Sequence, residues 1–123
     1  MIRGVVNARN EAIVRLRMRG PGHSGLDVDV VVDSGFTSTL ALPASTIAAL
    51  GLIQQSGSRA VLADGSSHQL DTFTAELSWD GSWRPVLVYA LGSDALLGMR
   101  LLARYELRIS VVPGGSVEIT PLP

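Results

Sequence analysis

The sequence has no cysteine, few aromatic residues and little net charge. Without cysteine, the chain can form neither disulfides nor thiolate metal sites. A formal charge of -1 gives no electrostatic reason to expect nucleic acid or an anionic membrane as a partner. Aromatic residues make up only 5% of the chain, which also argues against a base-stacking surface.

Long apolar runs are missing as well. No run approaches the roughly 20 residues that a transmembrane helix needs. Residues 1–6 lack the apolar core and the small-residue cleavage site of a signal peptide, so we expect a soluble, cytoplasmic protein. The 123 residues suffice to bury a core, and we expect one domain over residues 1–123.

The pattern that is present is mostly β. Residues 12–18 alternate apolar and basic side chains, and residues 26–32 alternate again after a turn rich in glycine, which predicts a hairpin. Asp64-Gly65 and Asp80-Gly81 are strong two-residue hairpin turns. A linker is expected at 56–58, and further strands are expected at 72–79, 83–91, 95–98, 107–112 and 116–120.

Two short helices complete the prediction. Pro43 suits the start and Gly51 the end of a helix over residues 44–50, and residues 99–105 form the second helix. Each helix follows an apolar strand that ends near a glycine, Gly35 in the first case and Gly98 in the second. This weak internal echo predicts that the two strands meet in the core.

A single carboxylate, Asp33, stands where the first of these apolar strands ends. Ser34 and Gly35 follow it directly, and Asp-Ser-Gly is good turn chemistry. From these residues alone, a turn carboxylate that accepts backbone N–H bonds is the favoured interpretation. A cation site is a weaker alternative, because Asp27, Asp29 and Asp33 are spaced to share one strand face.

Three features that follow one another along the chain favour a catalytic role for Asp33 over a turn role. They are Val32-Asp33-Ser34-Gly35, the hairpin at Ala63-Asp64-Gly65, and Leu96-Leu97-Gly98-Met99 before a helix. Together they resemble the retroviral-type, retropepsin-like aspartic proteases, and most closely their small bacterial relatives. The resemblance covers about residues 5–117. It implies a closed, mostly β acid-protease barrel with one or two short helices.

The resemblance also implies a function and a site. The function is that of an aspartic endopeptidase, active as a homodimer on peptide or protein substrates and needing no metal or other cofactor. Asp33 would be the catalytic acid, and two copies would share a proton, so that one activates water and the other donates to the carbonyl oxygen. The other implied residues are the loop supports Ser34, Gly35 and Thr37, the flap Ala63, Asp64, Gly65 and Ser66, and the core element Leu96, Leu97 and Gly98.

Some residues depart from the family pattern. Phe36 stands where the family usually has Ala or Ser, Arg100 lies one place later than the usual arginine, and Pro121 and Pro123 suit an interdigitated dimer sheet poorly. These departures keep open a second hypothesis, a non-catalytic peptide-binding or interaction module on the same fold. Substrate pockets are expected near the apolar side chains of Val31, Phe36, Leu62 and Val88.

Overall fold

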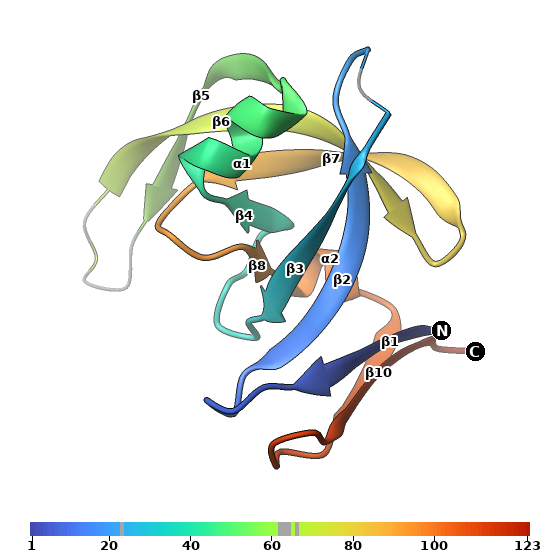
Figure 1. Cartoon of the computed structure of the whole chain (residues 1–123). Helices are drawn as coiled ribbons and strands as arrows, with labels where there is room; N and C mark the ends of the chain where they lie inside the picture. Colours follow the sequence, from blue (N-terminus) through green and yellow to red (C-terminus); the bar gives the residue numbers. More distant parts are fainter. Residues whose placement is uncertain (23, 62–64, 66) are drawn as a thin grey trace.

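The structure is a computed structural model that describes residues 1–22, 24–61, 65 and 67–123, with only the backbone for 56–61 and 67–69. In this described part, the chain forms ten strands and two short helices (Figure 1). In chain order they are β1 Ile2–Val6, β2 Ala12–Arg19, β3 Leu26–Val32, β4 Leu40–Leu42, α1 Ala44–Leu50, β5 Ile53–Val61, β6 Ser67–Trp79, β7 Ser82–Ala90, β8 Leu96–Leu97, α2 Met99–Leu102, β9 Tyr105–Ile109 and β10 Ser116–Pro121.

A closed barrel forms the centre of the molecule. The strands β6, β7, β4, β8, β3 and β2 are hydrogen-bonded in this order, and β2 pairs back with β6 to close the ring. Closure uses the end of β2, where Met18 lies opposite Leu77. The closed, mostly β architecture with two short helices confirms the fold expected from the sequence.

Alternation of side chains explains which face of each strand is buried. In β2, Ala12, Val14, Leu16 and Met18 are buried, while the arginines between them reach solvent or half-exposed positions. The same alternation leaves Asp27 and Asp29 exposed on β3. The barrel interior is therefore filled by aliphatic side chains, with helix α1 adding Ile47 and Leu50 to the core.

The two apolar strands of the internal echo meet, as predicted. β3 and β8 pair in parallel, with Val31 opposite Leu96 and Val32 opposite Leu97. β4 pairs antiparallel with the other side of β8. The chain therefore leaves β3 at Asp33, forms a loop, and returns as β4 on the far side of β8.

The terminal segments form an extension of the barrel sheet. β1 pairs with β2 and with β10, and β10 pairs with β9. Figure 1 shows β1 and β10 side by side, with the two chain ends close together. The N-terminal and C-terminal strands are therefore already partners within one chain.

Local turn chemistry agrees with the sequence at several points. Asp80 and Gly81 both have positive φ, 49° and 92°, as a type I′ hairpin turn requires. Gly51 ends α1 in the left-handed region at φ 62°, and its N–H bonds back to the helix. Helix α1 spans the predicted residues, with Pro43 at its start.

Three expectations are wrong in detail. Residues 56–58 are part of β5 and not a linker, because a bulge between Gln55 and Ser58 keeps the strand paired with β6. The second helix ends at Leu102, because Arg104 turns into the left-handed region at φ 68° and Tyr105 begins β9. β9 ends at Ile109, because the chain turns through bonds such as Gly115 N–H to the Val112 carbonyl, 2.7 Å.

Within the described residues, neither helix has the length and apolar character to cross a bilayer.

Candidate active site

Asp33 is held at the end of β3 by the neighbouring strand. Its N–H donates to the carbonyl oxygen of Leu97 at 2.9 Å, which carries the β3–β8 ladder one residue beyond the strand. The side chain is half-buried. The carboxylate therefore projects from a fixed backbone position at the rim of the barrel.

A tight turn follows the carboxylate. Oδ1 of Asp33 accepts a hydrogen bond from the Gly35 N–H at 2.9 Å, and the Asp33 carbonyl accepts one from the Phe36 N–H at 3.1 Å. This is the turn in which an Asp side chain bonds the backbone two residues on. In the part of the chain that the structure describes, Oδ2 of Asp33 accepts no hydrogen bond, so one carboxylate oxygen stays available.

Gly98 supports this loop from behind. Its N–H donates to the Thr39 carbonyl at 2.8 Å, and the next two N–H groups, of Met99 and Arg100, donate to Phe36 and Ser38 at 2.8 and 3.1 Å. A Cβ atom at Gly98 would lie 2.2 Å from the Ser38 carbonyl oxygen and 2.7 Å from the Phe36 ring. The loop can approach so closely only because residue 98 has no side chain.

The ring of Phe36 lies beside Gly98, where a Cβ atom would approach it to 2.7 Å. It meets Tyr89 edge to face, with ring centroids 6.2 Å apart and an interplanar angle of 88°. Thr39 adds a second tie, since its hydroxyl donates to the Leu87 carbonyl on β7. Neither Thr39 nor Tyr89 was predicted from the sequence, although the run of hydroxyl residues at 37–39 was a signal.

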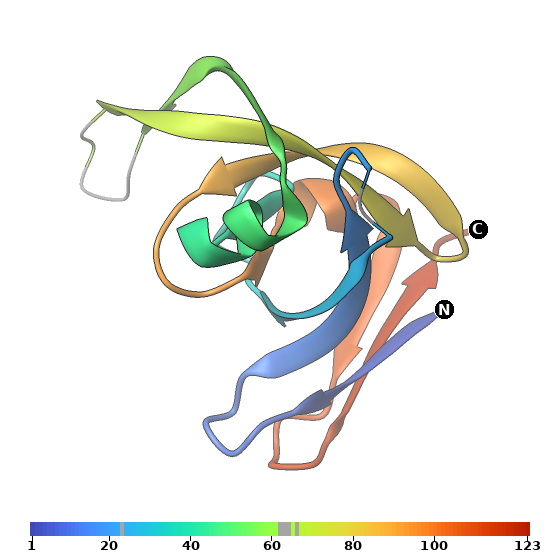
Figure 2. The ribbon, with the colours of Figure 1, turned by 45° about the horizontal axis from the view of Figure 1, so that its top comes forward.

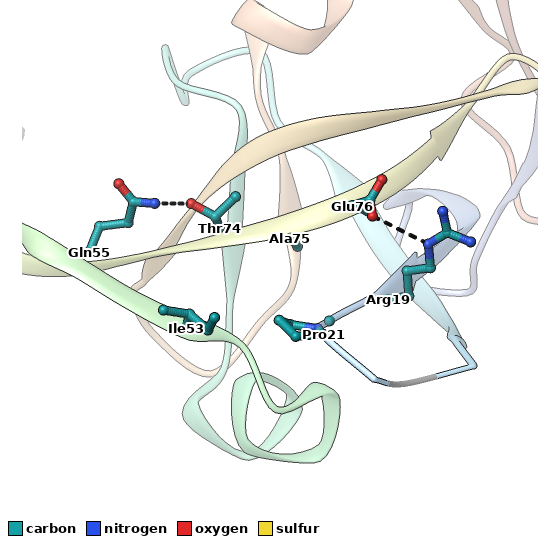
Figure 3. Close-up of a pocket in the computed structure, with 8 residues that line it drawn as sticks. Arg19, Pro21, Ile53, Gln55, Thr74, Ala75 and Glu76 are labelled. Carbon is teal, nitrogen blue, oxygen red and sulfur yellow. Dashed lines mark hydrogen bonds and ion pairs between the residues drawn. The ribbon is translucent and has the colours of Figure 1, made fainter.

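Two hollows lie near the β5–β6 hairpin. One, of about 370 Å³, is lined by Pro21, Ile53 and Ala75 and bounded by an Arg19–Glu76 ion pair at 3.6 Å and a hydrogen bond from Gln55 to Thr74 (Figure 3). The other, of about 320 Å³, lies between α1 and the strands β6 and β7 and includes Phe73. Neither is lined by Asp33, so neither makes an enclosed site around the carboxylate.

No protein-family model matches this sequence, and no curated protein matches it. Among solved structures, an EIAV protease complexed with the inhibitor HBY-793 is similar, with a TM-score of 0.52 and 16% sequence identity. The likeness covers 78% of this chain and 88% of that one. The chain has the retropepsin-like fold.

In this retropepsin-like fold, several predicted site residues come together. Ser34, Gly35 and Thr37 lie in the exposed loop that follows Asp33, and Leu96, Leu97 and Gly98 lie directly beside it. Within the described residues, the hydroxyls of Ser34 and Thr37 make no hydrogen bond. A bracing role for either hydroxyl would therefore need a group outside the described residues.

The predicted flap lies largely beyond the described residues. Ala63, Asp64 and Ser66 are outside them, as is the pocket residue Leu62, while Gly65 has a positive φ of 83°. The two strands that lead to this turn are paired as far as Val61 and Ser67. Figure 2 shows the β5–β6 pair reaching well beyond the barrel.

The predicted pocket residues differ in how far their side chains are buried. Val31 and Phe36 are half-buried, so both have surface left to offer a ligand. Val88 is wrong as a pocket residue, because its side chain is fully buried in the barrel core. Arg100 is exposed and, among the described residues, has no ion-pair partner.

The acidic residues on β3 do not form a cation site with Asp33. Asp27 pairs with Arg17 at 3.0 Å and Asp29 with Arg15 at 2.9 Å, across the β2–β3 ladder. The hydrogen bond from Arg15 holds the pKa of Asp29 below its ordinary value. No cluster of three metal-ligating side chains occurs among the residues that the structure describes.

Proposed function

We propose that this chain is an aspartic-type endopeptidase that is active as a homodimer, with two Asp33 carboxylates acting on one water. Residues 1–123 would form a single catalytic domain. Membership among the small bacterial relatives and a cytoplasmic location stay predictions of the sequence.

The observation that carries the proposal is the setting of Asp33. On a retropepsin-like fold, its carboxylate stands at the end of a parallel strand pair, in a turn closed by Gly35 and supported by Gly98. Oδ1 of Asp33 accepts the hydrogen bond that closes the turn, and Oδ2 has no hydrogen-bond partner among the described residues. This fixes the direction of the side chain while leaving an oxygen for chemistry.

Peptide hydrolysis needs a base for the water and an acid for the carbonyl oxygen. One carboxylate cannot serve as both at the same moment, but two at close distance can, because like charges so near cannot both ionise. In the dimer, the ionised Asp33 would take a proton from water while the protonated Asp33 donates to the scissile carbonyl. We therefore expect the highest activity at acidic to neutral pH.

An extended peptide is the substrate that this architecture suits. The β5–β6 hairpin would lie over it, with Ala63, Asp64, Gly65 and Ser66 as the flap, and backbone hydrogen bonds would hold the peptide as an added strand. Val31 and Phe36 would offer apolar contact near the scissile bond. Ser34 would brace the partner's loop across the two-fold axis, with Gly35 and Thr37 shaping the turn.

The decisive experiment replaces Asp33 by Asn and measures cleavage of a quenched peptide library between acidic and neutral pH. We expect a loss of about 10³-fold or more, because Asn can neither ionise nor deliver a proton. Asp94→Asn is the matched control, since Asp94 is exposed and has no partner among the described residues. A statine-type transition-state mimic should block the wild-type activity, and cleavage that survives Asp33→Asn would sink the proposal.

A second candidate is a non-catalytic peptide-binding module on the same fold. The observation that favours it is the pairing of β1 with β10 inside one chain, which occupies the terminal strands that an interdigitated dimer would share. Such a module would bind extended peptides as a monomer and cleave none. Equal peptide affinity of wild type and Asp33→Asn, with no cleavage by either, would favour this candidate.

A further inference from the structure

Strand β9 is the last strand of the sheet, and its outer edge is unpaired among the described residues. Two hydrogen bonds just beyond its ends show which backbone groups point inward. Ser110 N–H donates to the Ser116 carbonyl at 3.0 Å, and Leu122 N–H donates to the Arg104 carbonyl at 2.9 Å. Because these directions alternate along an antiparallel strand, the N–H and C=O groups of residues 105, 107 and 109 face the open edge.

The side chains of β9 alternate as well. Tyr105, Leu107 and Ile109 are half-buried against the core, while Glu106 and Arg108 are exposed, with 55% and 73% of their side-chain surface accessible. Glu106 and Arg108 carry opposite charges, lie on either side of Leu107, and form an exposed ion pair with each other at 3.5 Å. β9 pairs with β10 along its other edge, and Figure 2 shows the two strands side by side.

We propose that two copies of this chain associate by antiparallel pairing of β9 with β9, with the two-fold axis at Leu107. Leu107 would then face the partner's Leu107, and Tyr105 would face the partner's Ile109. These are the residues whose backbone groups point outward, so each pair can exchange both of its hydrogen bonds. Both strands keep their apolar side chains on the core face of the joined sheet.

Charge selects this register. In this register, Glu106 lies opposite the partner's Arg108 and Arg108 lies opposite the partner's Glu106. Both are non-hydrogen-bonded pairs, in which facing side chains are closest. A slip in one direction sets Glu106 against the partner's Glu106, and a slip in the other sets Arg108 against the partner's Arg108. Charged edge strands normally resist pairing, but in this register the β9 edge is complementary to a second copy of itself.

This interface rests on the proposed homodimeric function and specifies how the dimer is built. β1 and β10 are partners within the chain, so the strand that is left to cross the two-fold axis is β9. β9 follows directly after α2, whose first residue, Met99, donates its N–H to Phe36 in the Asp33 loop at 2.8 Å. The pairing would therefore join the two chains through the element that supports each catalytic loop.

Charge exchange tests the interface in the full chain. Glu106→Arg alone and Arg108→Glu alone each create two like-charge contacts, and each should raise the dimer dissociation constant by about tenfold or more in sedimentation equilibrium. The double variant Glu106→Arg/Arg108→Glu should restore the wild-type constant. An equimolar mixture of the two single variants should form heterodimers, and Arg84→Glu, an exposed change on β7, should have no effect.

The outcomes separate this inference from the proposed function. Restored association in the double variant and in the mixture supports β9 pairing, whereas circular dichroism confirms that the single variants are folded. A wild-type chain that is monomeric at all concentrations, or folded single variants that associate as the wild type does, would overturn the interface. Folded single variants that associate as the wild type does would overturn the β9 interface alone, whereas a wild-type monomer would also rule out the homodimeric function. Whether cleavage depends on Asp33 is decided separately by the Asp33→Asn variant.

Discussion

A Cβ atom on Gly98 would lie 2.2 Å from the carbonyl oxygen of Ser38. No flexible side chain can move aside here, since the obstructing atom belongs to the backbone of the Asp33 loop. The N–H of Gly98 is itself bonded to Thr39 in that loop. The contact is therefore tight at the point where the Asp33 loop ends and β4 begins.

Gly98→Ala should push the Asp33 loop away from β8. We expect the free energy of unfolding to fall by about 1–3 kcal/mol, as for other overpacked sites, and peptide cleavage to fall with it. Urea denaturation measures the first effect and the peptide assay the second. Gly35→Ala is the control for stability alone, because its Cβ would crowd a side-chain atom, Oδ1 of Asp33 at 3.2 Å, and not the backbone. A Gly98→Ala protein as stable as the wild type would contradict the close approach.

The turn role of Asp33 can be separated from its proposed catalytic role. Asn keeps the oxygen that accepts the Gly35 N–H, so Asp33→Asn should unfold at nearly the wild-type denaturant concentration. Asp33→Ala removes that acceptor and should lower the free energy of unfolding by about 0.5–1.5 kcal/mol. Equal stability of the two variants would mean that the 2.9 Å hydrogen bond contributes nothing to the fold.

Local patterns were sufficient to predict much of this arrangement. The alternation in β2 and β3, the Asp80-Gly81 turn and helix α1 depend on neighbouring residues, and all appear where expected. The adjacency of β3 and β8 followed from the repeated unit of apolar strand and glycine. What placed Asp33 in a supported turn was the combination of these elements, since the tripeptide alone is ordinary turn chemistry.

Other features depend on pairing between distant segments and leave no local signal. Residues 56–58 have a linker's composition, but pairing with β6 keeps them in a strand. The union of β1 with β10 joins the two ends of the chain, and no periodicity in either segment predicts it. The contact between Phe36 and Tyr89 likewise joins residues far apart in sequence, which is why the ring of Phe36 could not be placed from the motif.

The ion pair between Arg15 and Asp29 should give the fold a small acid sensitivity. Because Arg15 lowers the pKa of Asp29 in the folded state, the gain is present above the unfolded value of about 3.9 and is lost as pH falls through the folded value. Both side chains are more than half exposed, so solvent screens the pair and we expect its effect on the free energy of unfolding to be small. Asp29→Asn should therefore differ from wild type at neutral pH and converge with it in acid, and added salt should shrink the difference. A constant difference across pH would contradict this assignment.

The Phe36–Tyr89 contact is the last feature to test, because it decides what an unusual residue does inside the motif. If Phe36 supports the loop from beneath, its energy should be coupled to that of Tyr89. A double-mutant cycle with Phe36→Leu and Tyr89→Leu should give a coupling of about 0.5–1.5 kcal/mol in urea denaturation. Cycling Phe36→Leu with Trp79→Leu provides the control, since Trp79 packs on Tyr105 instead. If Phe36 is coupled to neither ring, while Phe36→Leu still changes peptide cleavage, then its role is contact with substrate and not support of the loop.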